Sequence, residues 1–247
     1  MTRRVTVTTA DEQQLTAYVA PGAPEPGSAG VVVIHEINGL TVHFASLCER
    51  LAQQGYSAIA PDLFSRDPRI VDDAKAGDYP SALSRIYQLG PERLVADLSS
   101  ARNALVTGYG VAPERVAVLG FCFGGYLTLL AATDPNGGWA AAAPFYGPPA
   151  GYGALGAPTD PNPLARADKL SCPARLFYGR QDGLIPAADA LEFVTKAQAA
   201  GGNAELVLED AGHAFFNDTR DTYHEAAAVH AWKELLVFLD STLKDEK

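Results

Sequence analysis

Short apolar runs separated by amphipathic stretches dominate the chain. Residues 31–34 are all apolar and β-branched, which is typical of a strand covered on both faces in a parallel sheet. Polar and apolar residues alternate in 4–8 and in 15–19, and this pattern predicts two leading strands that form an antiparallel hairpin at a sheet edge. Five further apolar runs predict strands at 57–60, 116–119, 140–145, 175–178 and 205–208.

Apolar residues at helical spacing lie between these runs. Five helices are predicted, over 41–55, 91–105, 125–132, 187–200 and a final segment with an apolar stripe of Val229, Trp232, Leu236 and Leu239. Strands that alternate with helices predict an α/β protein whose doubly wound, mainly parallel sheet is flanked by helices.

Two segments follow neither pattern. Residues 61–90 are mixed and charged, and they are long for a connection within a compact domain, so a lid or a binding loop is expected there. Residues 147–167 are rich in Pro, Gly and Ala and directly precede a predicted strand, which predicts a surface loop. The chain has 247 residues, 47% of them hydrophobic, with no internal repeat or low-complexity linker. We therefore expect one large α/β domain over 1–247.

Composition excludes several classes of function. A net charge of −10 and a pI near 4.9 argue against nucleic acid as a partner, because phosphate binding requires a basic surface. The N-terminus has no apolar signal-peptide core, and no uninterrupted apolar stretch reaches the ~18 residues of a membrane span. Three widely spaced cysteines give neither a disulfide framework nor a zinc-binding pair. We expect a cytoplasmic monomer or small homo-oligomer without membrane contact, metal or cofactor.

Residues 120–124 read Gly-Phe-Cys-Phe-Gly, between a predicted strand and a predicted helix. This order is typical of a nucleophile elbow, with Cys in place of Ser. The flanking glycines let the backbone crowd together, so the side chain of Cys122 is expected to stand clear at the end of the strand. The alternative is a buried thiol that acts as a small hydrophobe, as free cysteines usually do and as we expect for Cys48.

Asp182 and then His213 follow Cys122 along the chain, which is the nucleophile, acid, histidine order of the α/β-hydrolases. Each of the three follows the end of a predicted strand, where open α/β sheets bind their ligands. In such a triad a thiolate attacks an acyl carbon, the imidazole moves the proton and the carboxylate fixes the imidazole tautomer. An ordinary thiol has a pKa of about 8.5, so activation by His213 and by the helix N-terminus would be required.

Each triad candidate also has a structural alternative. Asp182 followed by Gly183 is a turn dipeptide just before a helix, and His213 can be an ordinary loop histidine. The other histidines on or near predicted helices are expected to be structural: His43, His224 and His230.

Six short motifs surround these candidates: IHEING at 34–39, APDLF at 60–64, GFCFGG at 120–125, FYG at 145–147, YGRQD at 178–182 and AGHAF at 211–215. Through them the chain resembles, over most of its length, the dienelactone hydrolases (carboxymethylenebutenolidases) of the α/β-hydrolase superfamily. The resemblance implies a triad of Cys122, His213 and Asp182. It also implies that Glu36 sits beside the nucleophile and helps to switch the thiol toward thiolate when substrate arrives. From the residues alone, Glu36 is an ordinary solvated loop carboxylate.

The oxyanion hole of this fold combines the backbone N–H after the nucleophile, here that of Phe123, with one from an earlier loop, here that of Ile37. Family members that act on dienelactone resemble one another in an Arg four residues after the catalytic His. This chain has Asn217 there, which carries no charge and argues against dienelactone itself as substrate. Further candidates for substrate binding lie in 61–90: Arg85 and Tyr87, with Arg66 and Arg69 as other sources of positive charge.

The sequence therefore predicts a cysteine-dependent hydrolase that cleaves an ester or lactone bond of a small molecule through a thioester acyl-enzyme. A thioesterase or broad carboxylesterase would use the same triad, and a catalytically silent scaffold that binds a small ligand remains an alternative because fold alone does not fix function. A silent scaffold would be free to lose one of four residues, yet all are present: Glu36, Cys122, Asp182 and His213. A redox enzyme is disfavoured, because no resolving Cys is adjacent to Cys122 in the sequence, although Cys172 could approach it in space.

Overall fold

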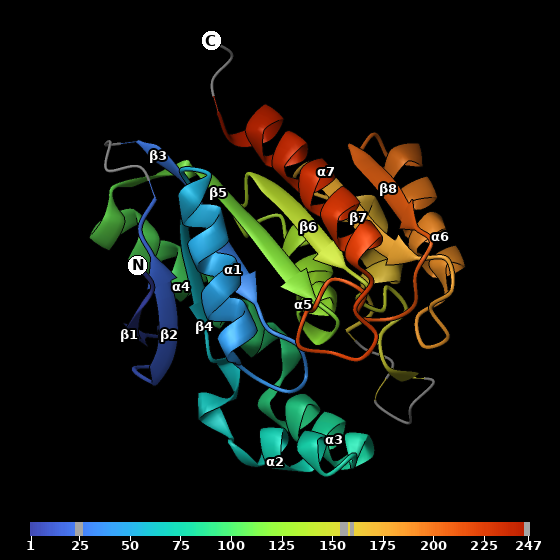
Figure 1. The fold of residues 1–247 in the computed structure, drawn as a ribbon, viewed down its shortest axis with the longest axis horizontal. Helices are drawn as coiled ribbons and strands as arrows, with labels where there is room; N and C mark the ends of the chain where they lie inside the picture. The colour runs from blue at the N-terminus through green and yellow to red at the C-terminus, as the bar shows by residue number, and fades with distance from the viewer. Residues whose placement is uncertain (23–26, 154–157, 159–160, 245–247) are drawn as a thin grey trace.

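The computed structural model describes residues 1–22, 27–153, 158 and 161–244. Its centre is an eight-stranded sheet with the order β1-β2-β4-β3-β5-β6-β7-β8 (Figure 1). The strands are β1 (Arg3–Thr8), β2 (Gln14–Ala20), β3 (Ser28–Ile34), β4 (Ser57–Pro61), β5 (Val111–Phe121), β6 (Ala141–Phe145), β7 (Ala174–Gly179) and β8 (Ala204–Glu209). Strand β2 pairs antiparallel with β1 and β4, and all other pairings are parallel, which confirms the edge hairpin and the mainly parallel sheet.

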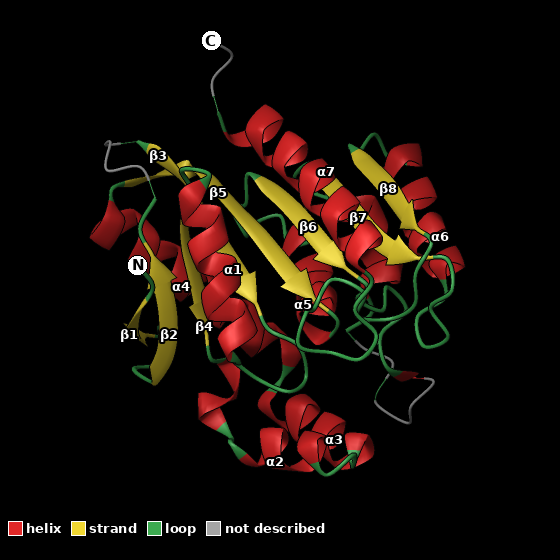
Figure 2. Ribbon diagram, in the orientation of Figure 1, coloured by secondary structure: helices red, strands yellow, loops and turns green. Residues whose placement is uncertain are grey.

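Helices cover both faces of this sheet (Figure 2). They are α1 (Val42–Gln53), α2 (Arg69–Lys75), α3 (Tyr79–Leu89), α4 (Pro91–Tyr109), α5 (Phe123–Ala132), α6 (Ala187–Ala199) and α7 (Glu225–Leu243), with short 3₁₀ helices η1 (Leu63–Arg66) and η3 (Pro163–Lys169). Helices α1 and α7 lie on the near face in Figure 1, and α4 and α5 lie on the far face. None of the described helices is long and apolar enough to cross a bilayer.

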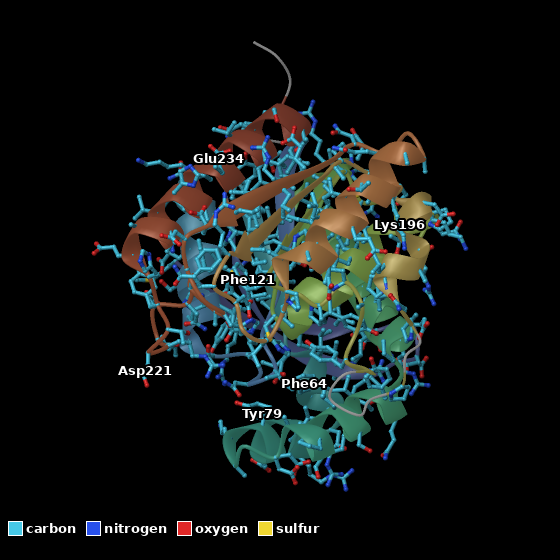
Figure 3. The ribbon with its side chains drawn as sticks, turned by 90° about the vertical axis from the view of Figure 1, so that its right-hand side faces the viewer. Phe64, Tyr79, Phe121, Lys196, Asp221 and Glu234 are labelled. Carbon is cyan, nitrogen blue, oxygen red and sulfur yellow. The ribbon has the colours of Figure 1, made fainter. Side chains whose placement is uncertain are left out.

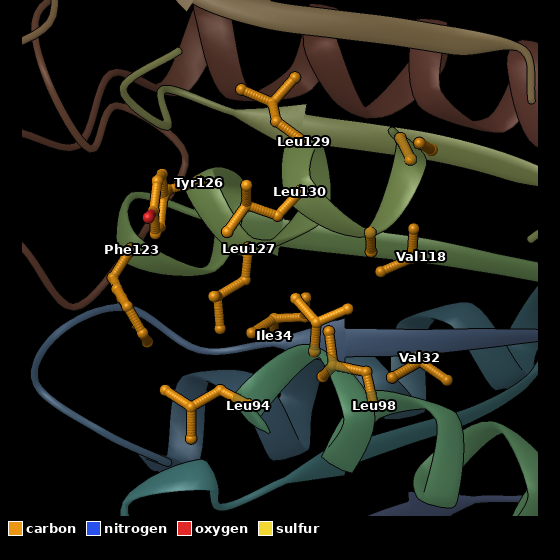
Figure 4. Close-up of a cluster of buried hydrophobic side chains, with 14 of the residues drawn as sticks. Val32, Ile34, Leu94, Leu98, Val118, Phe123, Tyr126, Leu127, Leu129 and Leu130 are labelled. Atoms are coloured by element: carbon orange, nitrogen blue, oxygen red, sulfur yellow. The ribbon is translucent and has the colours of Figure 1, made fainter. Parts of the chain in front are cut away.

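The period of two along strand β3 divides the core into two layers. Val31 and Val33 pack with α1 and α7, whereas Val32 and Ile34 pack with α4 and α5. Figure 4 shows the second layer, in which side chains of α4 and α5 meet those of the sheet. A strand buried on both faces needs apolar residues at every position, which is why the run 31–34 shows no alternation.

Two expectations about local structure hold only in part. The segment 61–90 is not an irregular connection, because it contains η1, α2 and α3, and whether it acts as a lid stays a prediction. In α7 Leu239 is buried as predicted, and Trp232 and Leu236 are partly buried against the core. The fully buried face lies mostly one position earlier and consists of Ala227, Ala228, Ala231, Leu235, Phe238, Leu239 and Leu243. Small alanines pack against the sheet, while Val229 is 47% exposed and the guanidinium of Arg50 covers the ring of Trp232 at 4.1 Å.

The segment 147–167 is only partly a surface loop. Tyr152 is buried, with 6% exposure, and η3 begins at Pro163. Residues 154–157 and 159–160 of this segment lie outside the described residues.

Parallel strands bring their carboxyl ends to one edge of the sheet. Glu36 follows β3, Cys122 follows β5, Asp182 follows β7 and His213 follows β8. The fold therefore gathers four loops from distant parts of the chain at one edge.

Candidate active site

The turn at Cys122 is as sharp as the sequence predicts. Its backbone has φ 52° and ψ −112°, a conformation that L-residues rarely adopt. A Cβ atom on Gly120 would lie 2.1 Å from the carbonyl oxygen of Gly124, and one on Gly124 would lie 2.4 Å from that of Ile34. Only glycine allows these backbones to approach so closely. As a result, the first turn of α5 packs directly against the end of β3.

The side chains of Cys122, His213 and Asp182 form a continuous hydrogen-bonded chain. The Nε2 atom of His213 lies 3.3 Å from the Sγ atom of Cys122, and its Nδ1 atom lies 2.8 Å from Oδ2 of Asp182. The Asp182 side chain is fully buried, the His213 side chain is 16% exposed, and Cys122 is half-buried. The carboxylate thus binds the inner end of the imidazole and leaves its other nitrogen to the thiol.

Asp182 is held rigidly in this position. Its Oδ1 atom accepts hydrogen bonds from the backbone N–H groups of Leu184 and Ile185, both at 2.9 Å, which leaves Oδ2 for His213. A Cβ on Gly179 would lie 2.2 Å from the carbonyl oxygen of Ala211, so glycine at the end of β7 lets the loop carrying His213 pass close by. The carboxylate therefore fulfils its turn-forming role and its imidazole-binding role together.

The electrostatic environment favours a charged imidazole. Burial alone would lower the pKa of His213, but negative charge on Cys122 and the hydrogen bond to Asp182 outweigh it and raise the pKa to about 10. A protonated imidazole beside the sulfur would stabilise a thiolate there.

Glu36 is buried, with 2% exposure, rather than solvated. Its Oε2 atom accepts hydrogen bonds from Nδ2 of Asn217 at 3.0 Å and from Nη2 and Nε of Arg220 at 3.1 and 3.3 Å. Its Oε1 atom accepts a weaker hydrogen bond from the hydroxyl of Tyr146 at 3.4 Å. Both oxygens of this buried carboxyl group therefore have hydrogen-bond donors, as buried polar atoms require.

Tyr146 connects Glu36 with the triad candidates. Its ring packs edge-on against the ring of His213, with centroids 5.1 Å apart. Burial raises the pKa of the Tyr146 hydroxyl, and the neighbouring Glu36 carboxylate and Cys122 raise it further. The phenol stays protonated and donates its hydrogen bond to Glu36.

The two expected oxyanion donors lie on the loops expected to carry them. Phe123 is the first residue of α5, where a backbone N–H has no acceptor within the helix. Ile37 follows Glu36 in the loop after β3. Their use as an oxyanion hole stays a prediction.

The substrate-binding candidates divide into two groups. Asn217 is buried and donates to Glu36. Nε of Arg85 donates to Asp73 at 2.6 Å, so this arginine links α3 to α2. The hydroxyl of Tyr87 is buried without a hydrogen-bond partner among the described residues. Their roles in binding substrate stay predictions.

Three residues of this region could not be predicted from the sequence. Arg220 gave no signal because its loop carries no motif, and Tyr146 lies in the FYG motif without an assigned role. Tyr152 packs edge-on against Tyr126, with centroids 5.4 Å apart. The pKa of the Tyr152 hydroxyl is raised by burial and by interaction with Cys122. Only the course of the loops brings these residues to the site.

Among the described residues, no group of three or more His, Cys, Asp or Glu side chains is arranged so that it could hold a metal ion.

Comparison with known proteins identifies the family of this chain. The model of the dienelactone hydrolase family matches residues 15–243. The chain belongs to the dienelactone hydrolase family. It is accordingly a dienelactone hydrolase-like hydrolase that acts on ester or lactone bonds.

Two relatives share the name "Putative carboxymethylenebutenolidase". The one from Salmonella typhimurium is 37% identical over 223 residues, which cover 89% of this chain and 79% of the relative. The one from Synechocystis sp. is 31% identical over 239 residues, which cover 94% of this chain and 93% of the relative. The similarity thus extends over nearly the whole length of this dienelactone hydrolase family member.

Solved structures agree on the α/β-hydrolase fold. A crystal structure of a "Putative Dienelactone Hydrolase" from Klebsiella pneumoniae superimposes with a TM-score of 0.84 at 30% identity, covering 97% of this chain and 98% of the other. Esterase 2 of Thermogutta terrifontis, in a form phosphorylated by paraoxon, gives a TM-score of 0.74 at 21% identity, covering 99% and 96%. At that lower identity the second comparison shows the shared fold alone.

Proposed function

We propose that this protein hydrolyses an ester or lactone of a small molecule through a Cys122, His213 and Asp182 triad and a thioester acyl-enzyme. One observation carries the proposal: a single imidazole lies 3.3 Å from the sulfur of Cys122 and 2.8 Å from the carboxylate of Asp182. Hydrogen bonds on both ring nitrogens are the geometry that nucleophilic catalysis requires.

In the first half-reaction the thiolate of Cys122 forms a bond to the acyl carbon. The carbonyl electrons move onto oxygen, which is stabilised by the N–H groups of Ile37 and Phe123. The imidazolium of His213 then gives its proton to the departing alkoxide as the carbon–oxygen bond breaks. Each oxyanion donor in such a site contributes a factor of about 10² to 10³ to kcat.

The second half-reaction regenerates the enzyme. Neutral His213 takes a proton from water, the resulting hydroxide attacks the thioester, and the sulfur of Cys122 leaves as thiolate. The buried carboxylate of Asp182 keeps the proton on Nδ1, so that Nε2 is free to exchange the transferred proton.

We further propose that Arg220 provides the positive charge that Asn217 lacks. Its side chain is 35% exposed, whereas Glu36, to which it is bonded, is 3% exposed. The side chain therefore reaches solvent at the rim of the site, with Nε and Nη2 bonded to Glu36 and Nη1 within 2.7 Å of the amide oxygen of Asn38 in its favoured orientation. We propose that the remaining N–H of Nη1 binds a substrate carboxylate. Esters that carry a free carboxylate are the expected substrate class, and Arg220→Gln should remove the preference for them.

The decisive test compares Cys122→Ala with the wild type on a small activated ester. Hydrolysis should be lost while circular dichroism and the urea midpoint show that the fold survives. Wild-type activity in Cys122→Ala would refute the triad, and faster hydrolysis of thioesters than of oxygen esters by the wild type would favour the thioesterase alternative.

Alkylation gives an independent test of the nucleophile. Iodoacetamide should label Cys122 before Cys48 and Cys172, because burial raises the pKa of those two thiols and shields them from the reagent. Peptide mass spectrometry at short times identifies the labelled residue. Earlier labelling of either buried cysteine would contradict the assignment.

A further inference from the structure

His35 is a buried titratable residue that the mechanism above does not use. It directly precedes Glu36, and its side chain has no exposed surface. Its Nδ1 atom lies 2.8 Å from the carbonyl oxygen of Glu36. Its Nε2 atom lies 3.2 Å from the backbone nitrogen of Leu63, at the start of η1. The ring thus connects the loop after β3 with the loop after β4.

These two contacts define the protonation state of the ring. Nε2 accepts a hydrogen bond from a backbone N–H and so carries no proton, whereas Nδ1 must carry one to donate to a carbonyl oxygen. Burial lowers the pKa of His35, which keeps the ring neutral. The neutral Nδ1–H tautomer is therefore the form that satisfies both contacts.

The bond to Glu36 also determines the direction of a neighbouring N–H group. The carbonyl of Glu36 and the N–H of Ile37 belong to one planar trans peptide unit, so they point in opposite directions. The N–H of Gly39 donates to the same carbonyl oxygen at 3.0 Å. Two donors on one oxygen fix the plane of the peptide, and with it the N–H of Ile37.

The ring of His35 is also linked to Phe123, the second proposed oxyanion donor, through the ring of Phe64. It packs edge-on against Phe64, with centroids 4.7 Å apart, and Phe64 packs against Phe123 at 5.4 Å. Figure 3 shows Phe64 between the sheet and the α2–α3 pair. Both residues whose N–H groups form the proposed oxyanion hole are therefore positioned with respect to the same imidazole.

We infer that His35 is a positioning residue for the oxyanion hole: by donating to the carbonyl of Glu36 it aims the N–H of Ile37 at the substrate oxygen. This inference rests on the proposed function. It assigns no proton transfer to His35, whose two nitrogens are both occupied by backbone groups.

The test compares three variants on the full-length protein. His35→Leu removes both hydrogen bonds but keeps an apolar side chain, and kcat for a small ester should fall about 10- to 100-fold with KM little changed, as expected when a donor is misdirected. His35→Gln offers one donor and one acceptor in place of the ring nitrogens and should recover much of the loss. His43→Leu is the matched control, because His43 is a second buried histidine (4% exposed) whose ring bonds the side chain of Asp218 and not the backbone of an oxyanion loop, and it should keep the wild-type kcat.

Alkylation of Cys122 separates positioning from general damage. Displacement by iodoacetamide creates no oxyanion, so its rate should be unchanged within about twofold in His35→Leu while ester hydrolysis falls. Wild-type kcat in His35→Leu, or equal losses of alkylation and hydrolysis, would overturn the inference. If His35→Leu does not fold, His35→Asn replaces it, because the shorter amide cannot span both backbone groups.

The same measurements distinguish the two proposals. Activity in Cys122→Ala would remove the proposed function itself. An inactive Cys122→Ala together with a fully active His35→Leu would leave the triad in place and remove only the role of His35.

Discussion

The pair of Glu36 and Arg220 offers a quantitative test of how the site is held together. Glu36→Gln, Arg220→Gln and the double variant form a double-mutant cycle that isolates the interaction between the two side chains. The carboxylate is nearly inaccessible to water, and the guanidinium donates two N–H groups to one of its oxygens. Arg220→Gln should destabilise the protein, because it leaves Glu36 with only Asn217 and Tyr146 as donors.

The coupling energy expected between Glu36 and Arg220 lies between the values for an exposed ion pair and for a shielded hydrogen bond to a charged group. Exposed ion pairs contribute about 0.2–1 kcal/mol, whereas a hydrogen bond to a charged group contributes about 1.5–3 kcal/mol when it is shielded from water. Since Arg220 is about one-third exposed, solvent screens part of the attraction, and a coupling energy of about 1–2 kcal/mol is expected. Arg220→Gln alone should cost about 1–3 kcal/mol.

Urea unfolding followed by circular dichroism measures all four proteins. The pair of Glu192 and Lys196 on α6 serves as a control, because both side chains are about half exposed, at 53% and 49%, and are spaced i,i+4. Its cycle should give about 0.3–0.5 kcal/mol. Figure 3 shows Lys196 on the outside of the molecule. A coupling for Glu36 and Arg220 no larger than in this control would refute the argument that burial strengthens the pair.

The remaining predictions concern the triad and the elbow. In Cys122→Ser the pKa of His213 should fall from about 10, because burial still lowers it while the interaction with the sulfur no longer raises it. An NMR titration of His213 measures this pKa, and an unchanged value would contradict the prediction. In the wild type, stability from this raised pKa is complete below about pH 6.5 and is lost as pH rises through about 10. Gly124→Ala should destabilise by several kcal/mol, about 3 or more, because its Cβ would meet the carbonyl oxygen of Ile34 at 2.4 Å. Gly108→Ala in α4, which meets nothing within 4 Å, should instead stabilise by about 0.5–1 kcal/mol, and equal urea midpoints for the two variants would contradict the elbow argument.

The strands, and the sheet edge at which the triad candidates meet, could be predicted because both depend on local sequence patterns. Apolar runs such as 31–34 are visible without any knowledge of neighbours, and residues that follow parallel strands must meet at one edge. The stripe of α7 was predicted only in part, with Leu239 buried but Val229 exposed, because helical periodicity alone cannot tell which of two adjacent apolar stripes faces the sheet. Alanines decided the outcome there, since their small side chains let the helix approach closely.

The partners of Glu36 could not be predicted from the sequence. Arg220 and Tyr146 lie 184 and 110 positions from Glu36, and their contacts depend on how two loops cross at the sheet edge. The sequence shows Asn at position 217, where family members that act on dienelactone have Arg. The arginines of 61–90 were therefore the expected source of positive charge. Arg85 is instead paired with Asp73, and the guanidinium beside Glu36 comes from a position only three residues after Asn217.

Backbone strain shows that the geometry of the site depends on the surrounding fold. Among the described residues, three non-glycine positions with positive φ flank the site: Cys122 at 52°, Tyr146 at 37° and Ala214 at 58°. Each such conformation costs about 1–3 kcal/mol and persists only where surrounding contacts determine it. The backbone N–H groups of Cys122 and Tyr146 donate to the carbonyls of Phe145 and Phe177, at 3.0 and 2.8 Å. The parallel strands thus supply the hydrogen bonds that hold the thiol and the phenol in place, so the sheet edge stabilises a geometry that the loops alone would not keep.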